Sequence, residues 1–236
     1  MTSDPWFSHW NYQFFVLLFQ HAPHSARADD LCDLLISEPL LSTWVFAASF
    51  YACWIKDDER RAQRRSYLIS AIVAFLVACL FTLLLRPWVH WPAPVLNPEF
   101  RSLFPTYRWG NGTTNCFPSH STLAYFMMAV GFWPISRRLS VTLSILALLL
   151  ISLPRIYAGG HYPIDVLFSC ALGILALISV WRWLNPAIST IGPAPTQRGE
   201  TICNLLAFLW MFELGEGFRG LELAAAVLIH RLGLRF

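Results

Sequence analysis

The sequence contains little charge: 13% of its 236 residues are Asp, Glu, Lys or Arg, whereas 56% are hydrophobic. A chain this apolar does not form an ordinary soluble domain, and its length suits one membrane domain. The net charge of +3 is too small to indicate a nucleic acid partner, and no basic run is interleaved with stacking aromatic residues. The composition therefore predicts a polytopic helical membrane protein.

Two other features are missing. The six cysteines form no C-x-x-C pair, so we expect no metal cluster and interpret most of them as small packing residues. A disulfide between Cys32 and Cys116 would require both to lie on one side of the membrane. The first residues have neither the basic start nor the cleavage site of a secretory signal peptide, so we expect insertion to depend on the spans themselves.

Apolar runs separated by polar connections predict the spans. Residues 6–22 are aromatic but interrupted by polar side chains, which favours an interfacial helix, although a sixth span stays open. We expect an all-α protein with about five to six transmembrane helices in one bundle, plus an extra helical tail. The five expected spans cover about residues 39–55, 67–85, 118–133, 139–154 and 161–183.

The C-terminal tail differs from the rest of the chain. Its two apolar stretches, near 202–212 and 221–229, are each too short to span a bilayer. We expect helices that lie at the interface or pack on the bundle, and through which the chain could contact another copy of itself or a membrane partner. The expected division is an N-terminal interfacial helix region at 1–38, a membrane core at 39–186 and the tail at 187–236.

Basic residues gather on one side of the five-span arrangement, which the positive-inside tendency makes cytoplasmic. The site would then face the exterior or periplasm, and we expect a bacterial inner membrane. The basic side holds Lys56, Arg60, Arg61, Arg64, Arg65, Arg137, Arg138 and Arg182, and the other side holds Arg86, Ser119, His120, Arg155 and His161.

The segment 154–165 places Arg155, His161 and Asp165 between two apolar runs, where ionisable residues usually indicate a functional site. If a helix begins near His161, Asp165 lies one turn further on the same face and can accept a hydrogen bond from one imidazole nitrogen. The other nitrogen is then left to act as a nucleophile or base. Two glycines permit a turn before the helix, and Pro163 suits its first turn. The pair could instead cap a span; the spacing would also suit zinc, but the sequence offers no clear third ligand nearby.

Three segments resemble the signature motifs of the type 2 phosphatidic acid phosphatase family. The resemblance covers about residues 10–184 and is closest to undecaprenyl diphosphate phosphatase-like members. It implies a membrane phosphatase that cleaves the terminal phosphate of a lipid diphosphate through a phosphohistidine, without metal or cofactor. The matching segments are Arg86-Pro87, Phe117-Pro118-Ser119-His120, and Arg155 followed after five residues by His161 and after three more by Asp165.

The same residue types suit phosphoryl transfer, which needs positioning and positive charge around three oxygens. His161 would attack phosphorus, Asp165 would stabilise the imidazolium, and His120 would protonate the leaving oxygen. The arginines would supply forked donors, and the start of a helix would supply a hydroxyl and backbone amides. The predicted binding residues are Arg86, Pro87, Ser119, Arg155 and Gly160, with Arg101 and Arg108 as further contacts from the long loop.

The chain departs from the family pattern at three positions. Cys79 stands where the family has a lysine, and Pro154 stands where it has a serine. Ser119 and His120 are adjacent, so Ser121 falls at the family's histidine position; we predict His120 as the acid because a helix start can absorb the shift. A phosphatidylglycerophosphate or phosphatidate phosphatase, a lipid phosphotransferase and a lipid transporter remain as alternatives.

Overall fold

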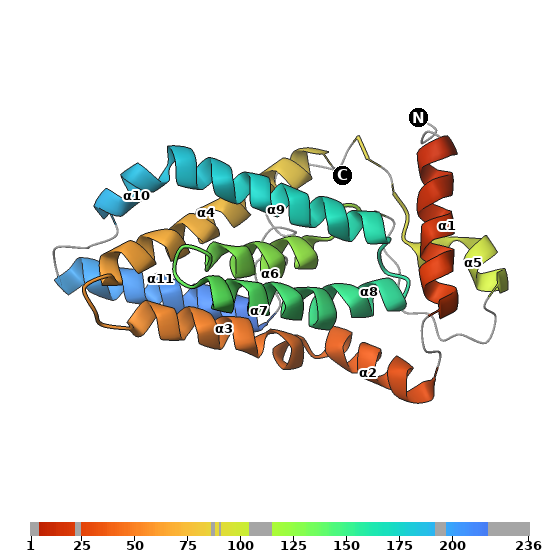
Figure 1. Ribbon diagram of the computed structural model, residues 1–236, viewed down its shortest axis with the longest axis horizontal. Coiled ribbons are helices and arrows are strands. Elements are labelled where there is room, and N and C mark those ends of the chain that lie inside the picture. The colour runs from red at the N-terminus through yellow and green to blue at the C-terminus, as the bar shows by residue number, and fades with distance from the viewer. Residues whose placement is uncertain are drawn as a thin grey trace, which may run out of the picture.

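All secondary structure in the described part of the chain is helical (Figure 1). The computed structural model describes residues 5–21, 25–85, 88–89, 91–103, 115–191 and 197–216. Its elements are α1 (Pro5–His21), α2 (Ala26–Ser37), α3 (Pro39–Ile55), α4 (Arg61–Leu85), the 3-10 turn η1 (Pro94–Leu96), α5 (Pro98–Leu103), α6 (His120–Gly131), α7 (Arg137–Leu146), the π-helical η2 (Ala147–Ser152), α8 (Leu153–Tyr157), α9 (Pro163–Trp183), α10 (Asn185–Ile191) and α11 (Gln197–Gly215).

Three continuous helices in the described residues are long and apolar enough to cross a membrane: α4, the run α7–η2–α8, and α9. The pair α2 and α3, bent by 56°, becomes a fourth if it is counted as one span. A helical membrane bundle is therefore confirmed, whereas the count of five to six spans is not. One reason is α6, which has 12 residues and, at about 1.5 Å per residue, reaches only part of a hydrocarbon core of about 30 Å.

The short helix α6 is the centre of the bundle. It packs against α4, α7 and α9, and most of its side chains are buried, including Leu123, Met127 and Met128. Two glycines allow the close approach: a Cβ at Gly173 of α9 would lie 3.1 Å from the Cβ of Met127, and one at Gly131 would lie 2.8 Å from the Cβ of Ala71. The spans therefore pack around α6 rather than beside it.

The first turn of α4 corrects one expectation from the sequence. The sequence predicts that the second span begins at about residue 67, but the helix begins at Arg61 and buries Arg64 and Arg65. Arg65 lies over the ring of Trp54 and donates to both carboxylate oxygens of Glu200, at 2.9 and 3.0 Å. The helix can start early because α11 supplies an anionic partner for its arginines.

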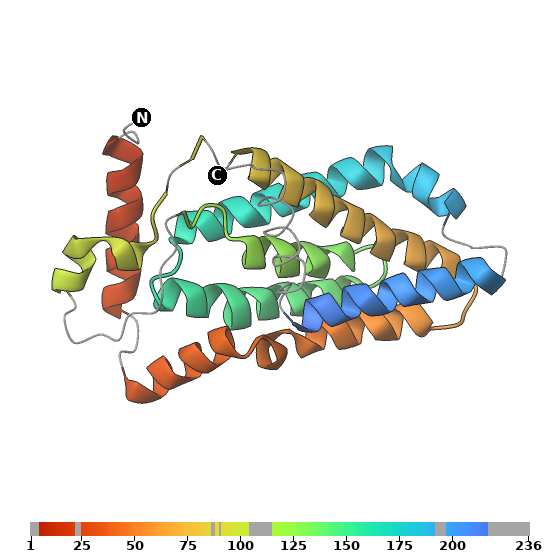
Figure 2. The ribbon, with the colours of Figure 1, turned by 180° about the vertical axis from the view of Figure 1, so that it is seen from behind.

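Two helices flank the ends and side of the bundle. The expected interfacial helix is α1, which stands across one end of the bundle (Figures 1 and 2). The ring of Phe15 lies 5.7 Å from that of Tyr162, and Phe19 lies 6.2 Å from Tyr157, so α1 covers the junction of α8 and α9. In the tail, α11 lies along α3 (Figure 2), while the apolar stretch 221–229 falls outside the described residues.

Candidate active site

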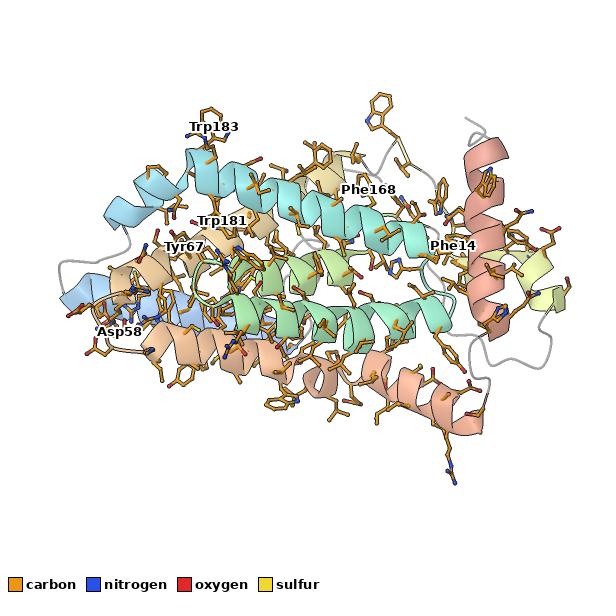
Figure 3. All side chains as sticks on the ribbon, viewed as in Figure 1. Phe14, Asp58, Tyr67, Phe168, Trp181 and Trp183 are labelled. Carbon is orange, nitrogen blue, oxygen red and sulfur yellow. The ribbon has the colours of Figure 1, made fainter. Side chains whose placement is uncertain are left out.

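The ends of four helices meet at one end of the bundle. The run α7–η2–α8 ends there and α9 begins there, while α4 ends where α6 begins. Thr82 of α4 contacts His120 of α6, and Cys116 before α6 contacts Asp165 of α9. Asp58, Tyr67 and Trp181 lie toward the other end, whereas Phe168 lies toward this one (Figure 3). The fold thus collects residues that are far apart in the sequence.

The His161 and Asp165 side chains lie close together, but not for the reason that the sequence suggested. The helix α9 begins at Pro163, so His161 precedes it and the two residues do not share a helix face. Asp165 instead closes a capping box, in which its Oδ2 accepts from the backbone N–H of Tyr162 at 2.8 Å. This bends the carboxylate back toward His161, whose Nδ1 lies 3.6 Å from Oδ2.

Two polar atoms of this pair are left open. Within the part of the chain that the structure describes, Oδ1 of Asp165 and Nδ1 of His161 are buried and have no hydrogen-bond partner. Asp165 is 0% exposed, whereas the side chain of His161 keeps 18% of its surface. Buried polar atoms without partners are rare and unfavourable in native proteins. The pair therefore keeps hydrogen-bonding capacity that no described residue uses.

Cys116 is a site residue that the sequence analysis missed. Its buried thiol donates to Oδ2 of Asp165 at 3.1 Å, and its backbone N–H donates to the carbonyl of Trp91 at 2.7 Å. Burial, and then the charge of Asp165, raise the pKa of the thiol well above its usual range. The sequence predicts packing roles for most of the cysteines, and no local pattern distinguishes Cys116. All six cysteines are free, so Cys32 and Cys116 form no disulfide.

The path of the chain into the site follows from a proline and a glycine. Pro154 has no backbone N–H and crowds the carbonyl four residues earlier, which accounts for the π-helical η2 before it. Arg155 is half-buried and donates from Nη1 to the carbonyl of Ile151 at 3.0 Å. After α8 the chain turns at Gly159, whose φ is 71°, and the N–H of Gly160 returns to the carbonyl of Arg155.

Ser119 and His120 occupy different environments although they are adjacent. Ser119 is fully buried, and its hydroxyl lies 3.0 Å from that of Thr122, which lies 2.8 Å from that of Ser152. His120 is exposed, and its Nε2 lies 3.1 Å from the hydroxyl oxygen of Thr82. Since Thr82 donates its proton to the carbonyl of Cys79, that oxygen accepts from His120. In this arrangement the proton on Nε2 of His120 faces Thr82.

The remaining predicted binding residues are only partly covered by the structure. Arg86, Pro87 and Arg108 lie outside the described residues, as does the side chain of Arg101. The helix α5, whose backbone includes Arg101, lies on the outer side of α1, away from the bundle (Figure 1). The roles of these four residues stay predictions.

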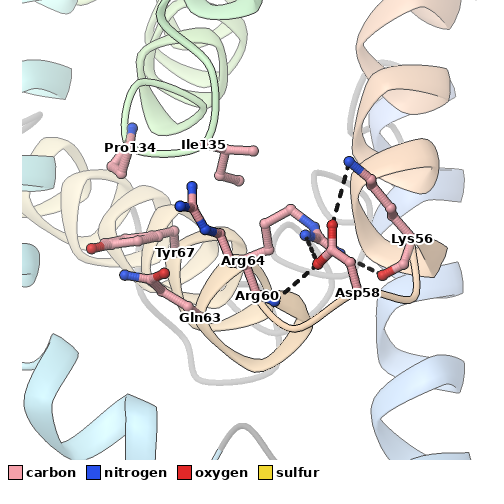
Figure 4. Close-up of a pocket in the computed structure, with 8 residues that line it drawn as sticks. All are labelled: Lys56, Asp58, Arg60, Gln63, Arg64, Tyr67, Pro134 and Ile135. Atoms are coloured by element: carbon pink, nitrogen blue, oxygen red, sulfur yellow. Dashed lines mark hydrogen bonds and ion pairs between the residues drawn. The ribbon is translucent and has the colours of Figure 1, made fainter.

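The opposite end of the bundle holds a cavity of about 340 Å³ (Figure 4). Asp58 lines it and pairs with Lys56 at 3.3 Å and with Arg64. The hydrogen bond from Arg64 holds the pKa of the Asp58 carboxyl below its usual range. None of the predicted site residues lines this cavity, whose walls are Lys56, Asp58, Arg60, Gln63, Arg64, Tyr67, Pro134 and Ile135.

The fold and the site together define a helical membrane protein with a paired His and Asp where its helices end. A family model described as the PAP2 superfamily matches residues 66–189, slightly more than half of the 236-residue chain. The chain belongs to this superfamily, and membership supports a phosphatase that acts on lipid phosphates. Comparison with curated proteins and with solved structures finds no match.

Proposed function

We propose that the chain is an integral membrane phosphatase that removes the terminal phosphate of a polyprenyl diphosphate through a phosphohistidine on His161. The observation that carries the proposal is the His161–Asp165 pair, with a buried carboxylate 3.6 Å from Nδ1 and an imidazole that keeps 18% of its surface. A carboxylate facing Nδ1 favours the tautomer in which Nε2 has a free lone pair. That nitrogen is the nucleophile in this mechanism.

The reaction proceeds in two steps. Nε2 of His161 attacks the terminal phosphorus, the P–N bond forms, and the P–O bond to the lipid phosphate breaks. The leaving oxygen takes a proton from His120, which must enter this step as the imidazolium and leaves it as the neutral imidazole. Water then attacks phosphorus, gives a proton back to His120 and releases inorganic phosphate, while His161 is regenerated. Throughout, Asp165 stabilises the positive charge of the imidazole.

The cationic and amide groups around His161 and Asp165 would bind the substrate. Arg86 and Arg155 would hold the phosphoryl oxygens by forked hydrogen bonds, and the first amides of α6 would add partial positive charge. The side chain of Ser119 makes no capping bond to that helix, which leaves the amides to an anion. This set of donors supports catalysis without a metal ion or cofactor.

The orientation in the membrane follows from charge. Arg60, Arg137 and Arg138 are exposed near the end of the bundle opposite His161, and a basic end is favoured on the cytoplasmic side. The active site would then face the periplasm or the exterior of a bacterial inner membrane. A diphosphate lipid that is dephosphorylated there would be a carrier used in building the cell envelope.

The proposal is tested by measuring phosphate release in EDTA, with purified protein in detergent, from a polyprenyl diphosphate and from phosphatidate. We expect faster release from the diphosphate, and acid-labile, alkali-stable labelling of the chain by substrate carrying a radioactive terminal phosphate. His161→Ala should abolish both signals. Preference for phosphatidate would favour a monoester phosphatase, and transfer of the label to added lipid would favour a phosphotransferase.

Two control comparisons sharpen the test. His21→Ala removes an exposed histidine at the end of α1 and should change neither rate nor labelling. His120→Ala and Ser121→Ala separate the two assignments of the acid: we expect a large loss only for His120→Ala. Labelling that survives His161→Ala would contradict the phosphohistidine, and an absence of release from both lipids would contradict the hydrolase.

A further inference from the structure

We propose that Cys116, His161 and Asp165 form an inhibitory zinc site inside the catalytic centre. One ligand atom from each residue, the thiol sulfur, an imidazole nitrogen and a carboxylate oxygen, lies within 4.8 Å of the other two. The three residues come from separate parts of the fold: the segment before α6, the turn before α9 and the first turn of α9. Zinc binding itself does not depend on the proposed function, whereas inhibition does.

The spacing of these atoms fits zinc. Tetrahedral zinc with sulfur at about 2.3 Å and nitrogen or oxygen at about 2.0–2.2 Å places its ligand atoms roughly 3.3–3.6 Å apart. Here the sulfur of Cys116 lies 3.1 Å from Oδ2 of Asp165, and Nδ1 of His161 lies 3.6 Å from the same oxygen. Small side-chain rotations therefore suffice to close the site, and a fourth position stays open for water or a phosphate oxygen.

The unpaired atoms provide independent support. Asp165 is completely buried, and within the described residues its Oδ1 and Nδ1 of His161 have no hydrogen-bond partner. A cation bound between Nδ1 of His161 and the Asp165 carboxylate would give that nitrogen a partner and neutralise the buried negative charge of Asp165. The side chain of His161, which is 18% exposed, gives an ion a route to ligands that are otherwise covered.

Zinc would block the reaction by fixing the wrong tautomer of His161. A neutral imidazole has one proton and one lone pair, and a metal on Nδ1 uses the lone pair there. The proton must then sit on Nε2, which can no longer attack phosphorus. In the balanced step, the Cys116 thiol releases its proton to solvent, the imidazole proton moves from Nδ1 to Nε2, and three bonds to zinc form without oxidation or reduction.

The binding test uses chelator-treated full-length protein in detergent. Co²⁺ serves as the spectroscopic probe, because thiolate coordination gives a sulfur-to-cobalt charge-transfer band, and competition with a zinc indicator gives the Zn²⁺ affinity. We expect one ion per chain and a thiolate band in the wild type. Cys116→Ser, which keeps a hydroxyl donor for Asp165, should lose the band and weaken Zn²⁺ binding by more than the roughly 10- to 100-fold typical of outer-sphere changes.

Controls keep the result interpretable. Cys203→Ser alters a free cysteine on α11 and should bind both ions as the wild type does. Asp165→Asn preserves the side-chain shape and should weaken Zn²⁺ binding while keeping the thiolate band, which tests the site even if Cys116→Ser does not fold. A wild-type spectrum without a thiolate band, or equal Zn²⁺ affinity in Cys116→Ser, would overturn the site.

Inhibition is read separately from binding. Zn²⁺ should stop phosphate release over the concentrations that fill the site, EDTA should restore it, and Cys116→Ser should resist Zn²⁺ when each rate is normalised to its own zinc-free value. A protein that binds zinc through Cys116 but never releases phosphate would overturn the proposed hydrolase and leave the metal site standing. Full activity with the site occupied would overturn inhibition.

Discussion

Two buried charged residues, Arg65 at the basic end of the bundle and Asp165 at the other, differ in how fully their polar atoms are paired. At the basic end, Arg65 is 5% exposed, and its guanidinium lies over Trp54 and donates to Glu200 and Asn204. At the other end, Asp165 is 0% exposed and faces a histidine at 3.6 Å, beyond hydrogen-bonding distance. Every guanidinium nitrogen of Arg65 therefore has a partner, whereas Asp165 keeps an oxygen that could bind another ligand.

The contrast suggests a test that separates structural from functional polar residues. The pair of buried Arg65 with half-buried Glu200 has a partner for each guanidinium nitrogen, and it joins α4 to α11. A buried carboxylate with one oxygen unpaired is less stable than it could be, and such sites are typical of catalysis. Mutations at the two ends should therefore divide cleanly between loss of stability and loss of activity.

The largest effect is expected at His161. His161→Gln removes the nucleophile and should lower phosphate release by at least about 10³-fold. The free energy of unfolding should change by less than about 1 kcal/mol, since Nδ1 has no hydrogen-bond partner among the described residues. Phosphate release in detergent checks the predicted loss of activity, and thermal unfolding in detergent checks the predicted stability. A marked drop in unfolding temperature would show that the histidine is structural.

The opposite outcome, loss of stability without loss of activity, is expected for Arg65→Met at the basic end. It keeps an apolar side chain over Trp54 but removes the partner of Glu200 and Asn204, so the free energy of unfolding should fall by about 1–3 kcal/mol. Phosphate release by the folded protein should change little. Arg138→Met, at an exposed position of α7, is the matched control and should leave the thermal unfolding curve in place. Equal thermal unfolding curves for the two variants would contradict a stabilising contact between Arg65 and Glu200.

A smaller effect is expected in the buried hydroxyl chain of Ser119, Thr122 and Ser152. Thr122→Val keeps the shape of the side chain but breaks both contacts, at 3.0 and 2.8 Å, and should destabilise the protein by about 1 kcal/mol. The double variant with Ser152→Ala should cost less than the sum of the two single changes, because each removes the same bond. Additive unfolding energies would mean that the hydroxyls do not cooperate.

Much of the architecture could be predicted because it follows from hydropathy. The segment 39–55 matches the bounds of α3, which counts as a span only together with α2, and the segment 6–22 matches α1 within one residue at each end. The gathering of His120 and His161 at one end follows from alternating helix directions. Such features depend on the composition of each segment alone, and the bilayer imposes that composition.

The details of the site could not be predicted because they depend on contacts between segments. Cys116 meets Asp165 only because the chain before α6 pairs with Trp91, and no local pattern fixes that pairing. The start of α9 at Pro163 depends on a capping box whose N-cap is Tyr162, an unusual residue at that position. In the same way, nothing near Arg61 and Arg65 in the sequence predicts that Glu200, far along the chain, binds both of them.

The smallest expected effect is the pH dependence of the contact between Arg65 of α4 and Glu200 of α11. The hydrogen bond from Arg65 is the main reason that the pKa of Glu200 lies below its ordinary value of 4.5. The charged carboxylate therefore stabilises the fold fully above that value, and its contribution disappears as the pH falls through the lower pKa of the folded state. We expect the gap in unfolding temperature between wild type and Glu200→Gln to be constant near neutral pH and to narrow below about pH 4.5. Glu59→Gln, at an exposed position, should show no such narrowing. A gap that persists unchanged into acid would mean that Glu200 holds α11 by its shape and not by its charge.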